Sequence, residues 1–224
     1  MSVRKTQSGP TSTGLRRNVK KLVRTLRLKP FYQEERRAVF EERWSAIEAR
    51  LSPGDSSFID IGCNIGDFTA SAASRGMFAI GIDAMEEAIL FARKRHARLP
   101  RCAFVLMDVT AAEVAKLPQV DVMLCLSVHH YWSRAVGEAG AWDMIGALAA
   151  KSRSFFFEPA TSYERYGAEV PDFKEHDQDS LDRYVMGNFA RVAPGHSVTH
   201  VNSTKSINKE DFRPMYLISK AAAV

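Results

Sequence analysis

Cysteine is scarce in this sequence. Only three of the 224 residues are cysteines, and no two of them form a C-x-x-C pair. Each lies in or beside an apolar run, where packing residues are common. An odd number of cysteines in such places argues against a disulfide framework. We therefore expect reduced thiols and a cytoplasmic protein, the three positions being Cys63, Cys102 and Cys125.

Long apolar runs are also missing. The stretch Val122-Met-Leu-Cys-Leu126 is among the longest without interruption. A helix that spans a bilayer needs roughly 20 such residues. The N-terminus also lacks the apolar block of a secretory signal. We therefore expect neither a membrane span nor export.

Acidic residues are absent from the first 29 positions. Nine of the 31 Lys and Arg residues fall there, which leaves 22 basic and 26 acidic residues in the rest of the chain. The sequence pI of about 9.2 therefore describes a basic arm, residues 1–30. It does not describe the domain predicted for residues 31–224.

The arm contains an amphipathic pattern. Val19, Leu22, Val23 and Leu26 recur at helical spacing, with basic residues between them. One role is peripheral docking on a glycan or on the anionic inner face of a membrane. A second is packing on the chain's own domain or on a partner subunit of a homodimer. Nucleic-acid binding is a third role, with less weight.

Strand-like and helical patterns alternate after the arm. A helical pattern over 31–51 precedes the first apolar run, and further strands are predicted at 77–82, 102–107, 121–127 and 153–158. Helices are predicted between them at 67–75, 85–97, 111–116 and 138–150. A helix over 179–190 and two runs at 196–203 and 212–219 complete the pattern. This order predicts an α/β fold with a doubly wound, Rossmann-like, mostly parallel seven-stranded sheet and a C-terminal antiparallel hairpin.

A glycine turn follows the first strand, in Asp60-Ile-Gly-Cys-Asn-Ile-Gly66. The G-x-G-x-x-G fingerprint of dinucleotide folds is missing, because Asn64 stands at the middle glycine. Asp67 opens the helix, where a carboxylate would repel a phosphate. The loop therefore favours a cofactor with a sugar, an adenine and an amino group but no phosphate. S-adenosylmethionine (SAM) fits that description.

Two more acids lie beside the following strands. Asp83 ends the second apolar run, where nucleotide-binding folds place a carboxylate that accepts hydrogen bonds from ribose hydroxyls. Asp108 follows the third run. Because the carboxyl ends of parallel strands meet at one edge of a sheet, these acids and Asp60 are expected to line one crevice.

These segments resemble the class I SAM-dependent methyltransferases over roughly residues 56–219. The resemblance implies that the methionine part of the cofactor lies against the first loop, the ribose at Asp83, and the adenine at the Met107-Asp-Val109 segment. The implied cofactor-binding residues are Asp60, Gly62, Cys63, Asn64, Gly66, Asp83, Asp108, Val109 and Ser127.

The fourth strand ends in Leu126-Ser-Val-His-His-Tyr-Trp132. His129 and His130 offer bases with pKa values near neutral, so one of them is predicted to be catalytic. Motifs for methylating base amino groups or cytosine carbon are absent, and Ser127 stands where catechol-type enzymes place a metal-binding aspartate. Oxygen methylation is thus predicted, with no metal ligands assigned and a divalent metal left open.

Three short segments narrow the acceptor: Leu126–His130, Phe155–Pro159 and Arg213–Ser219. Together they resemble bacterial O-antigen chain-terminating methyltransferases, and the first two are similar to methylphosphate capping enzymes of RNA. The resemblance implies a saccharide acceptor in polysaccharide assembly, methylated on a sugar hydroxyl or a sugar phosphate. The alternatives are an RNA 5′ phosphate, a small-molecule hydroxyl, or a scaffold subunit that binds the cofactor without catalysis. Predicted acceptor contacts are Tyr32, Arg36, Tyr131, Trp132, Glu158, Arg213 and Tyr216.

Overall fold

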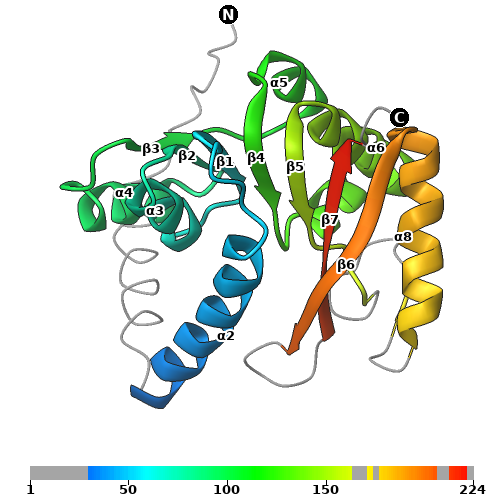
Figure 1. Cartoon of the computed structure of the whole chain (residues 1–224), viewed down its shortest axis with the longest axis horizontal. Helices are drawn as coiled ribbons and strands as arrows, with labels where there is room; N and C mark the ends of the chain where they lie inside the picture. The colour runs from blue at the N-terminus through cyan, green and yellow to red at the C-terminus, as the bar shows by residue number, and fades with distance from the viewer. Residues whose placement is uncertain (1–29, 163–170, 174–176, 206–211, 221–224) are drawn as a thin grey trace, which may run out of the picture.

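The computed structural model describes residues 30–162, 171–173, 177–205 and 212–220 (Figure 1). The helices run over α2 (Pro30–Glu48), α3 (Asp67–Ser74), α4 (Glu86–Arg95), α5 (Ala111–Lys116), α6 (His129–Ala150) and α8 (Gln178–Val192). The strands are β1 (Ser57–Ile61), β2 (Phe78–Asp83), β3 (Cys102–Leu106), β4 (Val120–Cys125), β5 (Ser152–Phe157), β6 (His196–Lys205) and β7 (Phe212–Lys220). The basic arm lies outside the described residues.

All seven strands form one sheet in the order β3-β2-β1-β4-β5-β7-β6. The first five are parallel to one another, whereas β7 is antiparallel to both β5 and β6. The predicted sheet with a C-terminal antiparallel hairpin is therefore confirmed. The boundary between arm and domain at residue 30 stays a prediction.

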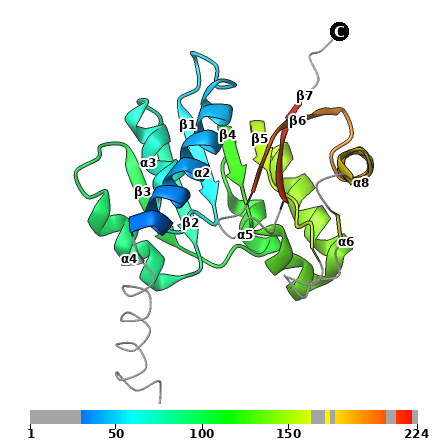
Figure 2. The same ribbon diagram turned by 90° about the horizontal axis from the view of Figure 1, so that it is seen from below.

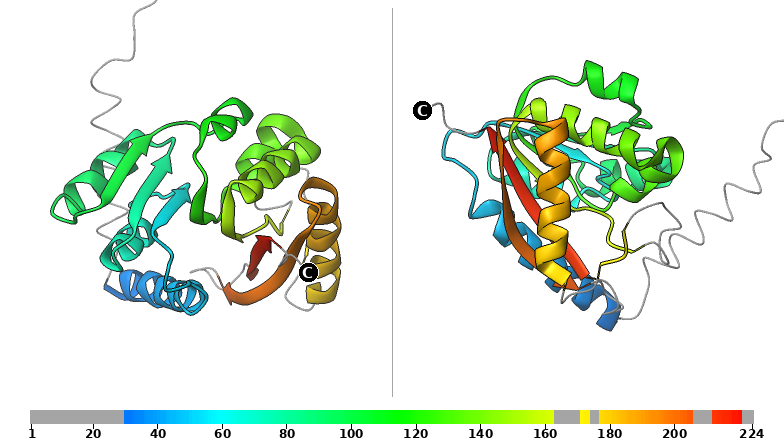
Figure 3. Two further views of the ribbon diagram at one scale, coloured as in Figure 1. Left: turned by 45° about the horizontal axis from the view of Figure 1, so that its top comes forward. Right: turned by 90° about the vertical axis from the view of Figure 1, so that its right-hand side faces the viewer.

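The sheet is buried on both faces at its centre. Val122, Met123, Leu124 and Cys125 of β4 are fully buried, which is why this strand is a continuous apolar run. One core lies under α5, α6 and α8, and a second lies under α2 and α3. The left view of Figure 3 shows the sheet between α2 and α6, and Figure 2 shows the same layers from below.

Helix α6 differs most from the sequence prediction. It begins at His129, well before the predicted start at 138, and Gly137 interrupts it with φ 75° and ψ 166°. The first helical piece follows directly from the end of β4. The backbone then turns at Gly137, a conformation that glycine tolerates without a steric cost. Two helical pieces therefore stand where the sequence predicted a loop and one helix.

Among the described residues, no helix is long and apolar enough to cross a membrane.

Candidate active site

The loop after β1 has an unusual backbone. Gly62, Asn64 and Gly66 all have positive φ, at 76°, 49° and 84°. A Cβ on Gly62 would overlap the Val128 side chain, and one on Gly66 would overlap the Phe104 ring. Both glycines are thus required by conformation and by packing. Asparagine is among the residues that best tolerate the left-handed region, so Asn64 departs from the G-x-G pattern at little cost.

Asp60 is a buried carboxyl at the base of this loop. It is 2% exposed, and the Thr69 hydroxyl donates to its Oδ2 at 2.9 Å. Burial raises the pKa of Asp60 to about 7, Asp83 adds to the rise, and Thr69 and Arg43 oppose it. The charged form of this carboxyl is therefore under-stabilised in the protein alone. A cationic ligand group beside it would favour that charged form.

This burial gives a prediction about stability. Between about pH 4 and pH 7, the unfolded chain ionises Asp60 while the folded protein keeps its proton, so stability falls as pH rises. At pH 8 we expect Asp60→Asn to increase the free energy of unfolding by on the order of 2–4 kcal/mol, since each pKa unit corresponds to about 1.4 kcal/mol. Cofactor binding should weaken in the same variant.

Urea unfolding of wild type and Asp60→Asn at pH 4 and pH 8 measures the effect. The gain should shrink towards pH 4, where the wild-type carboxyl is protonated in both states. An equal gain at both pH values would show that the charge of Asp60 is not its cause.

Asp83 holds the loop from the neighbouring strand. Its Oδ2 accepts a hydrogen bond from the Asn64 N–H, and its Oδ1 accepts one from the Met85 N–H, both at 2.8 Å. Each oxygen keeps a lone pair for a further donor. Asp83 is half-buried at the end of β2, so it can order the loop and still face a ligand.

The third acid, Asp108, and its neighbour Val109 differ in their exposure to solvent. Asp108 is exposed after β3, whereas Val109 is buried in the larger core. The structure thus leaves the Asp108 carboxyl open to a ligand, while the Val109 side chain packs inside the protein. Their contact with adenine stays a prediction. Cys63, in the first loop, is buried, and burial raises the pKa of its thiol.

His129 lies in the interior. Its side chain is fully buried, with the rings of Trp142 and Phe157 at 5.0 and 5.6 Å between centroids. The Ala160 N–H donates to Nδ1 at 3.2 Å, which leaves the proton on Nε2. Burial lowers the pKa of His129 to about 4. A neutral ring whose free lone pair is already occupied is poorly suited to take a proton, so this geometry argues against His129 as the catalytic base.

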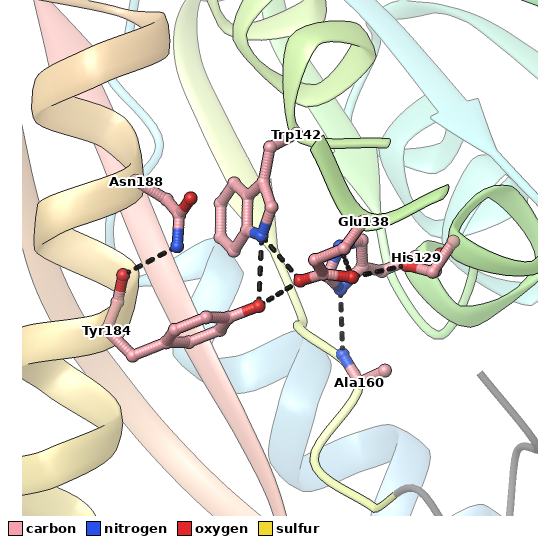
Figure 4. A network of polar contacts seen from close by, with 7 residues as sticks. His129, Glu138, Trp142, Ala160, Tyr184 and Asn188 are labelled. Atoms are coloured by element: carbon pink, nitrogen blue, oxygen red, sulfur yellow. Dashed lines mark hydrogen bonds and ion pairs between the residues drawn. The ribbon is translucent and has the colours of Figure 1, made fainter. Parts of the chain in front are cut away.

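A polar network surrounds this histidine (Figure 4). Gly137 turns the chain so that Glu138 points back into the protein, where its Oε1 accepts from Trp142 Nε1 at 2.8 Å and from the Tyr184 hydroxyl. Its Oε2 accepts from the Ser133 hydroxyl at 2.8 Å and lies 3.7 Å from His129 Nε2. The network joins α6, α8 and the segment after β5. His129 is therefore better explained as a residue that holds these three segments in place.

The buried histidine should make the protein sensitive to acid. The unfolded chain binds a proton near the ordinary pKa of 6.5, whereas the folded protein binds it only near 4, so stability falls as pH drops between these values. We expect wild type to lose on the order of 2–3 kcal/mol more than His129→Gln between pH 7 and pH 4. Urea titrations at several pH values measure this slope. Parallel slopes for the two proteins would contradict it.

The next three residues have different surroundings. His130 is buried, with its ring 4.1 Å from that of Tyr131. Tyr131 is exposed, and the Arg134 guanidinium lies 5.1 Å from its ring centroid. Trp132 is 7% exposed and packs in the larger core. Of the predicted acceptor aromatics, Tyr131 is therefore the one open to a ligand, and Trp132 is a core residue.

A charged cluster lies where β4 and β5 end. Glu158 is 3% exposed and accepts from Arg43 Nη2 at 2.5 Å and from the Ser127 hydroxyl at 2.6 Å. Arg213 Nη1 donates to that hydroxyl at 3.1 Å and lies 3.8 Å from Glu158 Oε1. Ser127 itself has φ 61°. The structure thus brings together three predicted residues, Ser127, Glu158 and Arg213, and adds Arg43.

Arg43 was missed from the sequence. It is one of several arginines on a predicted helix, and nothing local distinguishes it from the solvated ones. In the folded chain it is 8% exposed, stacks 5.4 Å from the Phe68 ring centroid and pairs with a residue 115 positions away. Only tertiary contacts could reveal this role.

Tyr216, a predicted acceptor contact, is fully buried on β7 in the structure. Its hydroxyl donates to Asp182 Oδ1 at 2.7 Å and accepts from Gln178 Nε2 at 3.1 Å. Tyr216 therefore fastens α8 to the sheet. Tyr32 and Arg36 lie on α2, but their side chains are outside the described part of the structure.

Residues 59–150 match a family model described as a methyltransferase domain. No curated protein sequence matches the chain. WbdD, a bifunctional kinase-methyltransferase, has a TM-score of 0.64 at 22% identity, covering 84% of this chain and 40% of that chain. This chain therefore spans well under half of WbdD.

Two other solved structures contain the cofactor or its product. Magnesium protoporphyrin IX methyltransferase (ChlM) from Synechocystis PCC 6803, with bound SAM, has a TM-score of 0.61 at 19% identity, covering 96% of this chain and all of that chain. The N-terminal domain of EvdMO1, with bound S-adenosylhomocysteine (SAH), has a TM-score of 0.56 at 15% identity, covering 81% and 80%.

The sheet order, the glycine loop and the acids at the strand ends are those of the class I SAM-dependent methyltransferase fold. Residues 59–150 match the methyltransferase-domain model, and structures of this fold hold SAM or SAH, so SAM is the cofactor against which the site's residues are compared. The residues fit this group, because Asp60 is a buried carboxyl that a cation would stabilise and Asp83 presents oxygens to hydroxyl donors. Among the described residues, no group of three His, Cys, Asp or Glu is placed to hold a metal ion.

Proposed function

We propose that this domain transfers the methyl group of SAM to an oxygen of a saccharide, either a sugar hydroxyl or a sugar phosphate, in polysaccharide or glycoconjugate assembly. The observation that carries the proposal is the cluster at the ends of β4 and β5. Ser127, Glu158 and Arg213 are hydrogen-bonding groups suited to a hydroxyl or a phosphate, and they lie at the sheet edge that carries Asp60. The fold shared with WbdD supports the same choice.

One set of residues binds the methyl donor, and another set binds the acceptor. Bound SAM supplies an electrophilic methyl group on a sulfonium centre. Asp60 and Asp83 orient the donor through its amino and hydroxyl groups, and the glycines of the first loop let the backbone approach it closely. The residues after β4 and β5 hold the acceptor in line with the methyl group, since alignment contributes much of the rate in such transfers.

A hydroxyl acceptor needs a base, and His130 is the remaining histidine of the pair. General base catalysis contributes roughly 10²–10⁴-fold. On a hydroxyl acceptor, His130→Ala should lower turnover by about that factor and leave SAH affinity unchanged. Full activity of this variant on such an acceptor would remove His130 from the mechanism.

Titration of SAH into the full chain tests the donor half of the proposal. Saturable binding is expected, and its absence from folded protein would overturn the proposal. A panel of sugars, sugar phosphates, small-molecule phenols and 5′-phosphorylated RNA, assayed for SAH formation, tests the acceptor half. Turnover restricted to RNA would replace the saccharide by a nucleic acid, and a steep dependence of RNA binding on salt would then implicate the basic arm.

We also propose a cytoplasmic location, peripheral at the inner membrane face, through the basic arm. The proposal rests on the charge of residues 1–29. Co-sedimentation with anionic and with neutral vesicles tests it. Equal recovery with both would contradict it.

A further inference from the structure

The charged cluster after β4 and β5 carries more positive than negative charge. Among the residues that the structure describes, two guanidinium groups, from Arg43 and Arg213, lie within ion-pair distance of one carboxylate, that of Glu158, while the buried Asp60 nearby has a raised pKa. The side chains of Arg43 and Glu158 are 10% and 3% exposed. One arginine is enough to neutralise the Glu158 carboxylate. The second arginine therefore leaves an excess of one positive charge in a site with little solvent. Such an excess is costly unless an anion shares the site.

Both arginines also have an unused donor. Arg43 Nε and Arg213 Nε are buried and have no hydrogen-bond partner within the described structure. A buried donor without an acceptor costs on the order of 1–3 kcal/mol. Guanidinium groups match oxyanions well, because their N–H donors pair with two oxygens at once. Charge and hydrogen bonding thus favour the same kind of ligand group, an oxyanion.

The cluster lies at the edge of the sheet where ligands are expected to bind. Ser127 and Glu158 follow the carboxyl ends of adjacent parallel strands, which is where open α/β sheets bind their ligands. Arg43 is close enough to Asp60 to lower its pKa, so the cluster adjoins the donor loop. The Arg213 side chain is 23% exposed, the most of the three charged groups. An anion entering from solvent would therefore meet Arg213 first.

We infer that this cluster, Arg43, Ser127, Glu158 and Arg213, binds an oxyanion group of the acceptor, so the acceptor is an acidic saccharide and not a neutral one. The inference rests on the proposed function and narrows its substrate class. Glu158 is the fixed counter-charge within ion-pair distance of both arginines. Arg213 carries the positive charge that pairs with the oxyanion of the acceptor.

An acidic acceptor also simplifies the chemistry. If the bound oxyanion is the nucleophile, its oxygen forms the new O–C bond with its own electron pair. The breaking S–C bond returns its pair to sulfur, which becomes neutral, so no proton has to leave. This agrees with the buried, neutral state of His129, which has no lone pair to offer.

Titration of SAH-saturated full-length protein with three sugars tests the inference. Glucose 1-phosphate and glucuronate carry oxyanions of two kinds, and glucose carries none, so the comparison isolates the charge and tells phosphate from carboxylate. At constant ionic strength, at least one acidic sugar should bind about tenfold or more tightly than glucose. Equal affinities for all three, with SAH still bound, would overturn the inference and leave the proposed function standing. Failure to bind SAH would instead count against the proposed function.

The Arg213→Met variant tests whether Arg213 contributes to the binding of acidic sugars. It leaves the Arg43–Glu158 pair balanced, so folding should be retained, and acidic-sugar affinity should fall about tenfold or more with SAH affinity unchanged. Arg213→Lys should recover part of the loss, because it restores the charge without the paired donors. Arg183→Met is the matched control: it makes the same exchange on exposed α8, where the Arg183 side chain donates to the Ser180 hydroxyl. Unchanged acidic-sugar binding by Arg213→Met, or a loss of SAH binding in its place, would overturn the inference.

Discussion

Replacing Asp83 by alanine is expected to weaken SAH binding by about 100-fold or more. Hydrogen bonds to a charged group contribute roughly 1.5–3 kcal/mol each, and the carboxylate is predicted to accept two from the ribose. The same carboxylate accepts the Asn64 and Met85 N–H groups. Its loss should therefore release the loop as well as the ligand. Isothermal titration of SAH into wild type and variant measures the change.

Glu86→Ala is the matched control, because it removes an exposed acid from the start of α4, three positions further along the chain. This variant should bind SAH as wild type does. Circular dichroism should show that Asp83→Ala is folded. A folded Asp83→Ala protein with SAH affinity within threefold of wild type would remove Asp83 from the cofactor site.

The second large effect is expected at Glu158. Glu158→Leu should lower the free energy of unfolding by about 3–5 kcal/mol, because it leaves the Arg43 and Arg213 guanidinium groups without a counter-charge in a buried place. The Ser127 hydroxyl also loses its acceptor. Urea unfolding followed by circular dichroism gives the difference.

A triple variant separates charge from packing. Arg43→Met, Glu158→Leu and Arg213→Met together remove every charge from the cluster, and buried ion pairs replaced by apolar residues are often no less stable. The triple variant should thus recover most of the stability lost in Glu158→Leu. A loss below about 1 kcal/mol in Glu158→Leu, or a triple variant as unstable as the single one, would show that the ion pairs do not control stability here.

The donor half of the site could be predicted from the sequence because its signals are local. The glycine loop, Asp60 before it and Asp83 at the next strand end each occupy a place that the alternation of strand and helix defines. Parallel β1 and β2 then bring Asp60 and Asp83 to one edge of the sheet. The mild departure at Asn64 was also predictable, since asparagine tolerates the positive φ that it adopts.

The acceptor half depends on the direction of each side chain, which short segments of sequence do not determine. His129 and His130 are adjacent in sequence, but helix α6 begins at this point and turns His129 into the core. Trp132 and Tyr216 are buried for the same reason, since each packs on elements that lie far away in the chain. Residue type alone does not distinguish a buried histidine from a catalytic one.

By itself, the sequence determined the alternation of elements, the seven-stranded sheet and the glycine loop of the predicted cofactor site, because hydrophobic periodicity and glycine turns are properties of short segments. Only the tertiary structure decided which charges share a buried site. Arg213 meets Ser127 across 86 positions, and Arg43 meets Glu158 across 115. The free energy of a charge depends on its burial and its partners, and both exist only once these distant segments are packed together.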